Sequence, residues 1–293
     1  MGRNHARVYA LLENAALTAV YDADPARAAA VAAEFGARAV TSLEALAAAC
    51  DVASVAVPTV AHREVGCRLM EAGVHVLMEK PIAPTVDDAQ ALVETAQRTG
   101  RVLQIGHIER FNPVMRELEK KLARPRFIEA HRLSPFPNRS MDIGVVLDLM
   151  IHDLEIILHL VRSPIASIDA VGVAVLTGQE DIANARLRFE NGCVANVTAS
   201  RISPDRMRKL RVFQEDCYLS LDYQGQSGHI HWKEGMEIKR ADVAVAPGEP
   251  LRLELEAFVA SVAAGEAPAV SGQQGTAALG VALEITRMIR KTF

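Results

Sequence analysis

Short apolar runs alternate with alanine-rich segments throughout the first hundred residues of this chain. The apolar runs, which are rich in strand-forming residues, occupy 17–21, 52–57, 74–78 and 102–105. The segments that predict helices occupy 4–12, 25–35, 61–72 and 86–99. Regular alternation of this kind predicts βαβ units, in which helices cover both faces of a parallel sheet. Because such crossovers are right-handed, the carboxyl ends of the strands line up along one edge, where we expect the ligand site.

The pattern changes after Arg126, where strand-like runs follow one another directly. They occupy 127–133, 168–176, 184–189, 194–200, 209–213 and 217–221. Turn signals such as Glu190-Asn191-Gly192 separate them, which predicts a largely antiparallel sheet with helices at 142–162, 251–264 and 274–291 on one face. The predicted fold is therefore α/β. A Rossmann-like dinucleotide-binding domain at 1–108 is followed by a substrate-binding α+β domain at 109–293 with a large, mostly antiparallel open sheet.

Composition narrows the classes of partner. The 293 residues carry a net charge of -4 and show no basic stripe, which argues against a nucleic-acid partner. The four cysteines show no CxxC spacing, so we expect a reducing compartment and hence the cytoplasm. The strongest apolar stretch, 145–161, is interrupted by ionisable residues, so we expect no membrane span.

The tripeptide Glu79-Lys80-Pro81 closes the apolar run at 74–78. The proline cannot continue a central strand, so Lys80 is expected at the strand's carboxyl end. Lysine changes its pKa readily when it is desolvated, so there it can give or take a proton beside a bound ligand. For the tripeptide in isolation, a surface lysine at a strand end is the simpler interpretation.

A carboxylate ends the first predicted strand. Asp22 occupies the position from which an acid accepts hydrogen bonds from both ribose hydroxyls of an adenosine, and there it would repel a 2′-phosphate. Gly2 stands 20 residues earlier, the offset expected for the last glycine of a dinucleotide fingerprint. The strand and the two earlier glycines of that fingerprint do not precede it. Because that strand normally lies at the centre of such a sheet and its turn carries the pyrophosphate, we expect Met1 to be an internal methionine. The alternative is a genuinely shortened chain, which would bind a dinucleotide poorly.

An acid and a histidine lie four residues apart in the helix predicted at 142–162. Asp148 and His152 would share one face of it. There the carboxylate can orient the imidazole and raise its basicity, leaving the other ring nitrogen to accept a proton. Two alternatives are open on this spacing. The pair can be a satisfied buried pair, or part of a metal site completed by His107 or His131, although no ligand motif is present.

Lys80, Asp148 and His152, placed after a Rossmann-like half, make a set that resembles the Gfo/Idh/MocA oxidoreductases, which oxidise or reduce a sugar or polyol carbon with a nicotinamide cofactor. The resemblance extends over nearly the whole chain and is carried by Gly2-Arg3-Asn4-His5-Ala6, Tyr21-Asp22, Glu79-Lys80-Pro81 and the helix with Asp148, His152 and Asp153. It implies that Lys80 contacts the nicotinamide ribose and the reacting hydroxyl, and that His152 is the base. It also implies NAD as the cofactor, held by Gly2, Asp22, Arg27, Pro58, Glu79 and Lys80.

A narrower resemblance concerns the substrate. The segments at 106–113, 134–139 and 142–148 are similar to a subgroup regarded as UDP-N-acetylglucosamine 3-dehydrogenases, which in bacteria serve lipid A synthesis. This similarity implies a UDP-sugar held by His107, Arg110, Asn112, Arg139, Asp148 and His152. Salt bridges are the alternative for both arginines. Inositol or a free aldose is an alternative substrate, a non-catalytic sugar or nucleotide sensor is an alternative function, and the open sheet predicts a homo-oligomer.

Overall fold

The computed structural model describes residues 1–136 and 143–291. The chain divides into two units. Unit 1 comprises Met1–Ile108 and Glu249–Thr276, and unit 2 comprises Glu109–Gly248 and Ala277–Phe293. The first segment of unit 1 ends at residue 108. The predicted second domain at 109–293 differs from the structure, in which 249–276 belongs to unit 1.

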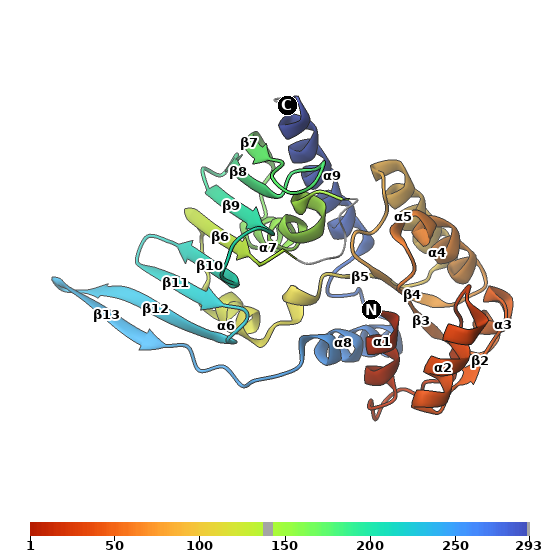
Figure 1. The fold of residues 1–293 in the computed structure, drawn as a ribbon. Coiled ribbons are helices and arrows are strands. Elements are labelled where there is room, and N and C mark those ends of the chain that lie inside the picture. Colours follow the sequence, from red (N-terminus) through yellow and green to blue (C-terminus); the bar gives the residue numbers. More distant parts are fainter. Residues whose placement is uncertain (137–142, 292–293) are drawn as a thin grey trace. The chain divides into compact units, whose positions relative to one another are not determined.

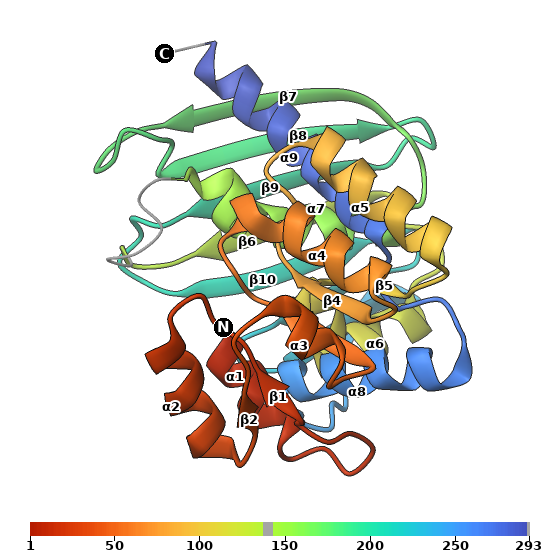
Figure 2. The same cartoon turned by 90° about the vertical axis from the view of Figure 1, so that its right-hand side faces the viewer.

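Unit 1 is built from parallel strands and helices (Figures 1 and 2). Its strands are β1 (Ala19–Val20), β2 (Arg38–Ala39), β3 (Val52–Val55), β4 (His75–Glu79) and β5 (Leu103–Gly106). Its helices are α1 (Gly2–Tyr9), α2 (Pro25–Phe35), α3 (Leu43–Ala47), the 3-10 turn η1 (Thr59–Ala61), α4 (His62–Glu71), α5 (Val86–Thr99) and α8 (Pro250–Ala264). Parallel pairing joins β3, β4 and β5 with β4 in the middle, and joins β1 to β2 in a separate sheet.

Single residues set the ends of two helices in unit 1. The Asp24 side chain accepts hydrogen bonds from two backbone N–H groups in the first turn of α2. Thr85 caps α5 through a backbone N–H in the same way. Gly36 and Gly100 end these helices with φ angles of 73° and 64°, in the left-handed region that favours glycine. Because both signals can be recognised in the sequence, α2 and α5 have the predicted bounds.

The sequence predicted that α8 covers one face of the second sheet. In the structure α8 instead packs within unit 1. Its buried residues Leu251, Leu255 and Phe258 form one apolar cluster with Tyr9 of α1 and Leu77 of β4. Burying each such large apolar side chain contributes about 1.5–3 kcal/mol. The apolar pattern of α8 identified a buried face but not the sheet that covers it, which explains the wrong assignment.

One eight-stranded sheet dominates unit 2, and Figure 1 shows its strands. Its strands are β6 (Phe127–Leu133), β7 (Ile165–Val173), β8 (Ile182–Phe189), β9 (Val194–Ser200), β10 (Met207–Phe213), β11 (Cys217–Asp222), β12 (Ser227–Glu234) and β13 (Glu237–Asp242). Their order is β13-β12-β11-β10-β6-β9-β8-β7, and every neighbouring pair is antiparallel except β6 with β9. The predicted α/β class, with a Rossmann-like part followed by a mostly antiparallel open sheet, is confirmed.

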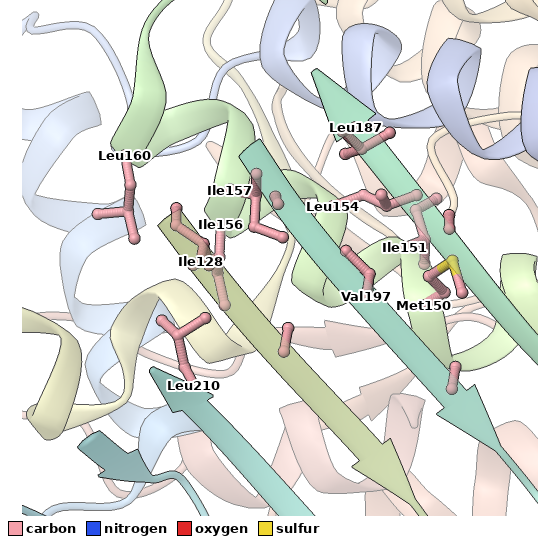
Figure 3. Close-up of a cluster of buried hydrophobic side chains, with 14 of the residues drawn as sticks. Ile128, Met150, Ile151, Leu154, Ile156, Ile157, Leu160, Leu187, Val197 and Leu210 are labelled. Atoms are coloured by element: carbon pink, nitrogen blue, oxygen red, sulfur yellow. The ribbon is translucent and has the colours of Figure 1, made fainter. Parts of the chain in front are cut away.

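Helices cover one face of this sheet. The helical elements are η2 (Ile108–Phe111), α6 (Pro113–Lys121), the π-helical turn η3 (Val146–Met150), α7 (Ile151–Val161) and α9 (Gly272–Arg290). Figure 3 shows Ile151, Leu154 and Ile157 of α7 beside Ile128 of β6 and Val197 of β9, all of them buried. No helix within the described ranges 1–136 and 143–291 is long and apolar enough to cross a membrane.

Candidate active site

Lys80 follows β4, the middle strand of the three-stranded sheet in unit 1. The neighbouring Glu79 carboxylate accepts a hydrogen bond from the Lys80 backbone N–H (3.2 Å) and shares one of 2.8 Å with Nε2 of His5 on α1. Opposite Glu79 on β5 lies Gly106, where a Cβ atom would approach the Glu79 Cα to 3.2 Å. The carboxyl end of β4 is therefore held from α1 and packed closely against β5. This arrangement fixes the backbone from which Lys80 projects.

A buried histidine joins the loops that follow β3 and β4. Nδ1 of His62 lies 3.1 Å from the carbonyl oxygen of Pro81 and 3.2 Å from that of Ile82, and Nε2 lies 3.1 Å from that of Val57. Burial lowers the pKa of His62, against the opposing effect of the three carbonyls. His62 thus lies between the loop that begins with Lys80 and the residues that follow β3.

The residues beyond β1 and at the start of α1 fit the adenosine half of a dinucleotide. Asp22 accepts a hydrogen bond from the Asp24 backbone N–H (2.9 Å), and its second oxygen lies 3.9 Å from Arg27. A contact of that length leaves the carboxylate able to accept bonds from ribose hydroxyls. Gly2 opens α1, whose first turn has no side-chain cap. The Asn4 and His5 N–H groups donate to the Met1 carbonyl, so the N–H groups of Gly2 and Arg3 are the ones that suit a pyrophosphate. Pro58 lies directly before η1, beyond the end of β3.

The helix predicted at 142–162 starts later in the structure and with a different geometry. In η3 the Ile151 N–H donates to the Val146 carbonyl, the i→i+5 bond of a π turn, and α7 follows. Asp148 lies in the π turn and His152 in the first turn of α7, and both are half-buried. The expectation of one regular α-helix is therefore corrected, although the two residues still lie on one continuous helical segment. Such π turns are frequent at functional sites.

A buried arginine holds the residue that follows His152. Arg132 of β6 donates hydrogen bonds of 2.8 and 2.9 Å to Asp153, and one of 2.8 Å to Glu109. All three side chains are buried. Burial opposes the positive charge, but Asp153 and Glu109 outweigh it and raise the pKa of Arg132. The first turn of α7 is thereby fastened to β6, which orients His152 relative to the sheet.

Two predicted substrate residues have close protein partners in unit 2. Arg110 donates a hydrogen bond of 2.7 Å to Glu155 of α7, with both side chains buried. Burial raises the pKa of Glu155 to about 7, against the attraction of Arg110. Asn112 caps α6 and donates a bond of 3.0 Å to the Tyr223 carbonyl. The salt bridge considered as an alternative for Arg110 is therefore present.

The two remaining predicted substrate residues are His107 and Arg139. His107 lies directly beyond β5 in unit 1 and is buried. Arg139 lies outside the described residues. Within residues 1–136 and 143–291, no group of three or more His, Cys, Asp or Glu side chains is arranged to hold a metal ion.

Three residues organise these two regions without a role predicted from the sequence, His5, His62 and Arg132. A signal existed for Arg132, because it lies two and four residues after Ala130 and Ile128 and so shares their buried face of β6. A charged residue in such a position requires a buried partner. The two histidines bond to groups 74 and up to 20 residues away, which no local pattern reveals.

Comparison with known proteins agrees with this architecture. A family model described as an oxidoreductase family with an NAD-binding Rossmann fold matches residues 1–107, and a Gfo/Idh/MocA C-terminal domain matches residues 118–220. The UDP-N-acetylglucosamine 3-dehydrogenase of Acidithiobacillus ferrooxidans is 38% identical over 292 residues, which cover 97% of this chain and 93% of that protein.

Solved structures extend the similarity to the fold. A structure of that dehydrogenase, GnnA, matches with a TM-score of 0.94 at 39% identity, covering 98% of this chain and 94% of the other. The inositol 2-dehydrogenase of Rhizobium meliloti is 25% identical in sequence over 320 residues, which cover 99% of this chain and 94% of the relative. The chain therefore belongs to the Gfo/Idh/MocA family of NAD-binding oxidoreductases.

Proposed function

We propose that this enzyme uses NAD to oxidise the C3 hydroxyl of UDP-N-acetylglucosamine to a ketone. The observation that carries the proposal is the 38% identity, over 97% of the chain, to a dehydrogenase named for that substrate and position. The location of Lys80 beyond β4 and of Asp148 and His152 on one helical segment supports it, because this chemistry needs a cation and a base at the reacting hydroxyl.

Residues of unit 1 are proposed to hold NAD, which when bound supplies the hydride acceptor. Asp22 accepts hydrogen bonds from the ribose hydroxyls, and the N–H groups of the turn at Gly2 bind the pyrophosphate. Arg27, 3.9 Å from Asp22, softens the preference against a 2′-phosphate. Pro58 and the Glu79-Lys80 pair contact the nicotinamide half from the strand ends.

In the proposed reaction His152 removes the proton of the C3 hydroxyl while the hydrogen on C3 leaves as hydride. The C–O bond becomes a carbonyl, and the products are a 3-keto sugar nucleotide, NADH and the protonated imidazole. Asp148 orients the ring and stabilises that protonated form. The Lys80 ammonium group stabilises the negative charge that develops on the oxygen.

His107 and Arg139 are proposed as direct contacts to the sugar nucleotide. Arg110 and Asn112 already have buried partners, so we infer that they shape the site. Arg110 would keep η2 against α7, and Asn112 would keep the start of α6 against Tyr223, directly after β11. A substitution such as Arg110→Ala would then change stability together with substrate affinity, because it leaves Glu155 buried without that partner.

We further propose that the enzyme is a cytoplasmic homo-oligomer in a lipid A or surface-polysaccharide pathway. Four free cysteines suit a reducing compartment. On the sheet face opposite the core, the rings of Phe127, Phe213, Tyr218 and His231 form a row with centroid separations of 5.6, 5.0 and 4.3 Å. Aromatic rings are enriched at interfaces. Light scattering should show a smaller assembly for Tyr218→Arg, and an unchanged mass would remove the row from the interface.

The function is tested by measuring NADH formation by the purified protein with UDP-N-acetylglucosamine, UDP-glucose and myo-inositol. We expect kcat/KM to favour UDP-N-acetylglucosamine by about tenfold or more, a difference of about 1.4 kcal/mol. Lys80→Ala should lower this rate. Preference for myo-inositol would instead match the reaction of the 25% identical relative. NAD binding without turnover of any of the three would favour a sensor.

A further inference from the structure

An arginine on the buried side of the large sheet has no carboxylate of its own. Arg208 of β10 lies directly opposite Arg132 of β6 in the antiparallel register, so both side chains project from the same face. Like charges in this position repel each other. Arg132 is neutralised by Asp153 and Glu109, whereas the shortest ion pair of Arg208 is a 3.6 Å contact with the Glu109 oxygen that already accepts from Arg132.

The donors of Arg208 are therefore available to a ligand. Its 3.6 Å contact is too long for a hydrogen bond, and within the described residues its side chain makes none. The side chain is 41% exposed, so solvent reaches the guanidinium. Burial lowers the pKa of Arg208, and Arg132 and Arg206 lower it further, while Glu109 and Asp153 act in the opposite direction. Three arginines beside two carboxylates leave a net positive charge.

We propose that Arg208, assisted by the exposed Arg206, binds the diphosphate of the nucleotide-sugar substrate. The planar guanidinium presents paired N–H donors that match two phosphate oxygens, which an ammonium group cannot do. This assignment rests on the proposed function, because it is the UDP-sugar that brings a diphosphate. The carboxylate that Arg208 shares with Arg132 belongs to the network that fixes Asp153 beside His152. Substrate recognition and orientation of the base therefore depend on one set of charges.

A purely structural role for Arg208 makes a different prediction. If the residue only balanced Glu109, its replacement would change the stability of unit 2 and leave nucleotide affinity unchanged. A measurement of diphosphate binding separates the two roles, because it does not depend on turnover. UDP is the probe, since it carries the diphosphate without the sugar.

The experiment compares Arg208→Gln with Arg211→Gln in the full chain by isothermal titration with UDP. Arg211 is a matched control, because it lies on the same strand, projects from the opposite face and makes a similar 3.6 Å contact with Glu129. We expect Arg208→Gln to raise the Kd for UDP about ten- to a hundredfold, the usual effect of losing a charged hydrogen-bonding partner. Arg206→Gln should raise it less. Arg211→Gln should leave it unchanged.

Arg208→Lys provides a second variant that keeps the charge and loses the paired donors. It should bind UDP with intermediate affinity and should retain the fold if Arg208→Gln does not. Wild-type affinity for UDP in both Arg208 variants would overturn the assignment. So would an equal loss in Arg211→Gln.

Kinetics with UDP-N-acetylglucosamine separates a failure of this site from a failure of the proposed function. If the wild-type enzyme oxidises that substrate and Arg208→Gln has an unchanged KM, the site is wrong and the function stands. If the enzyme binds UDP through Arg208 but oxidises another UDP-sugar, the site stands and the substrate is wrong. If the wild-type protein does not bind UDP, the diphosphate site is wrong, and NADH formation with UDP-N-acetylglucosamine alone decides the function.

Discussion

The guanidinium of Arg132 meets the carboxylate of Asp153 through two hydrogen bonds, with the two side chains only 4% and 2% exposed. Removing one partner of such a pair leaves an uncompensated buried charge, which typically costs 3–5 kcal/mol. Glu109 still faces Arg132, so we expect Asp153→Ala to lower the free energy of unfolding by about 3 kcal/mol in urea denaturation. Arg211→Gln should lower it by about 0.5 kcal/mol or less. Equal losses would contradict this account of the network.

Replacing His152 tests the proposed base. We expect His152→Ala to lower kcat by about two to four powers of ten, the usual contribution of a positioned proton acceptor, without changing the Kd for NAD. Asp148→Asn should lower kcat by a smaller factor, because the imidazole of His152 remains. The control is His159→Ala on the same helix, whose ring bonds to Glu119 at 2.9 Å. Full activity in His152→Ala would place the base elsewhere, with Lys80 the next candidate.

Asp22 is expected to set the cofactor preference. Its carboxylate favours the ribose hydroxyls of NAD and repels the extra phosphate of NADP, so kcat/KM should be higher with NAD. Asp22→Ala should narrow the difference, mainly by weakening NAD. Asp24→Asn removes a neighbouring charge while keeping a residue that can cap α2, so its preference should match wild type. Equal efficiencies with both cofactors in the wild-type enzyme would show that Asp22 does not discriminate.

A fully buried carboxyl group predicts a pH dependence of stability. Glu254 of α8 has no solvent exposure, and within the described residues neither carboxyl oxygen has a hydrogen-bond partner. Burial, together with the charge of Glu79, raises the pKa of Glu254 well above its ordinary value. The folded protein therefore keeps this proton at a pH where the unfolded chain releases it.

The sign of the effect follows from that difference in bound protons. As pH rises above the ordinary pKa of a glutamic acid, near 4.5, the folded state loses stability by up to about 1.4 kcal/mol per pH unit. Glu254→Gln removes this loss, so the stability of the variant relative to wild type should increase between pH 5 and pH 8 in urea unfolding. Glu256, which is partly exposed on the same helix and paired with Arg252, gives the control, Glu256→Gln. A difference that does not change with pH would mean that Glu254 is ionised in the folded protein.

Local patterns in the sequence were sufficient to predict those helices and strands whose ends and faces are set by neighbouring residues. The strands at 127–133 and 194–200 have their predicted bounds, because strand-forming residues occupy both runs. The hairpin formed by Ser227–Glu234 and Glu237–Asp242 was missed, because its residues are mostly polar and it lies at the sheet edge. There, register with β11 forms a strand that composition does not indicate.

In the candidate site, too, some residues could be predicted from local patterns and others could not. Lys80 and His152 stand in motifs that can be read locally, and the structure puts one at a strand end and the other on a helix, as expected. The charged network around Arg132 could not be derived in the same way, because its partners lie 21 and 23 residues away and depend on sheet register. The opposition of Arg132 and Arg208 likewise required knowledge that β10 pairs with β6.

His62 faces carbonyl oxygens on both sides of its ring, and carbonyl oxygens only accept hydrogen bonds. Since burial lowers its pKa, the ring is neutral at neutral pH and has one proton to donate. One tautomer binds the loop of Lys80, and the other binds the end of β3 at Val57. The two strand ends therefore compete for a single hydrogen atom, so firmer binding of one loop weakens the hold on the other.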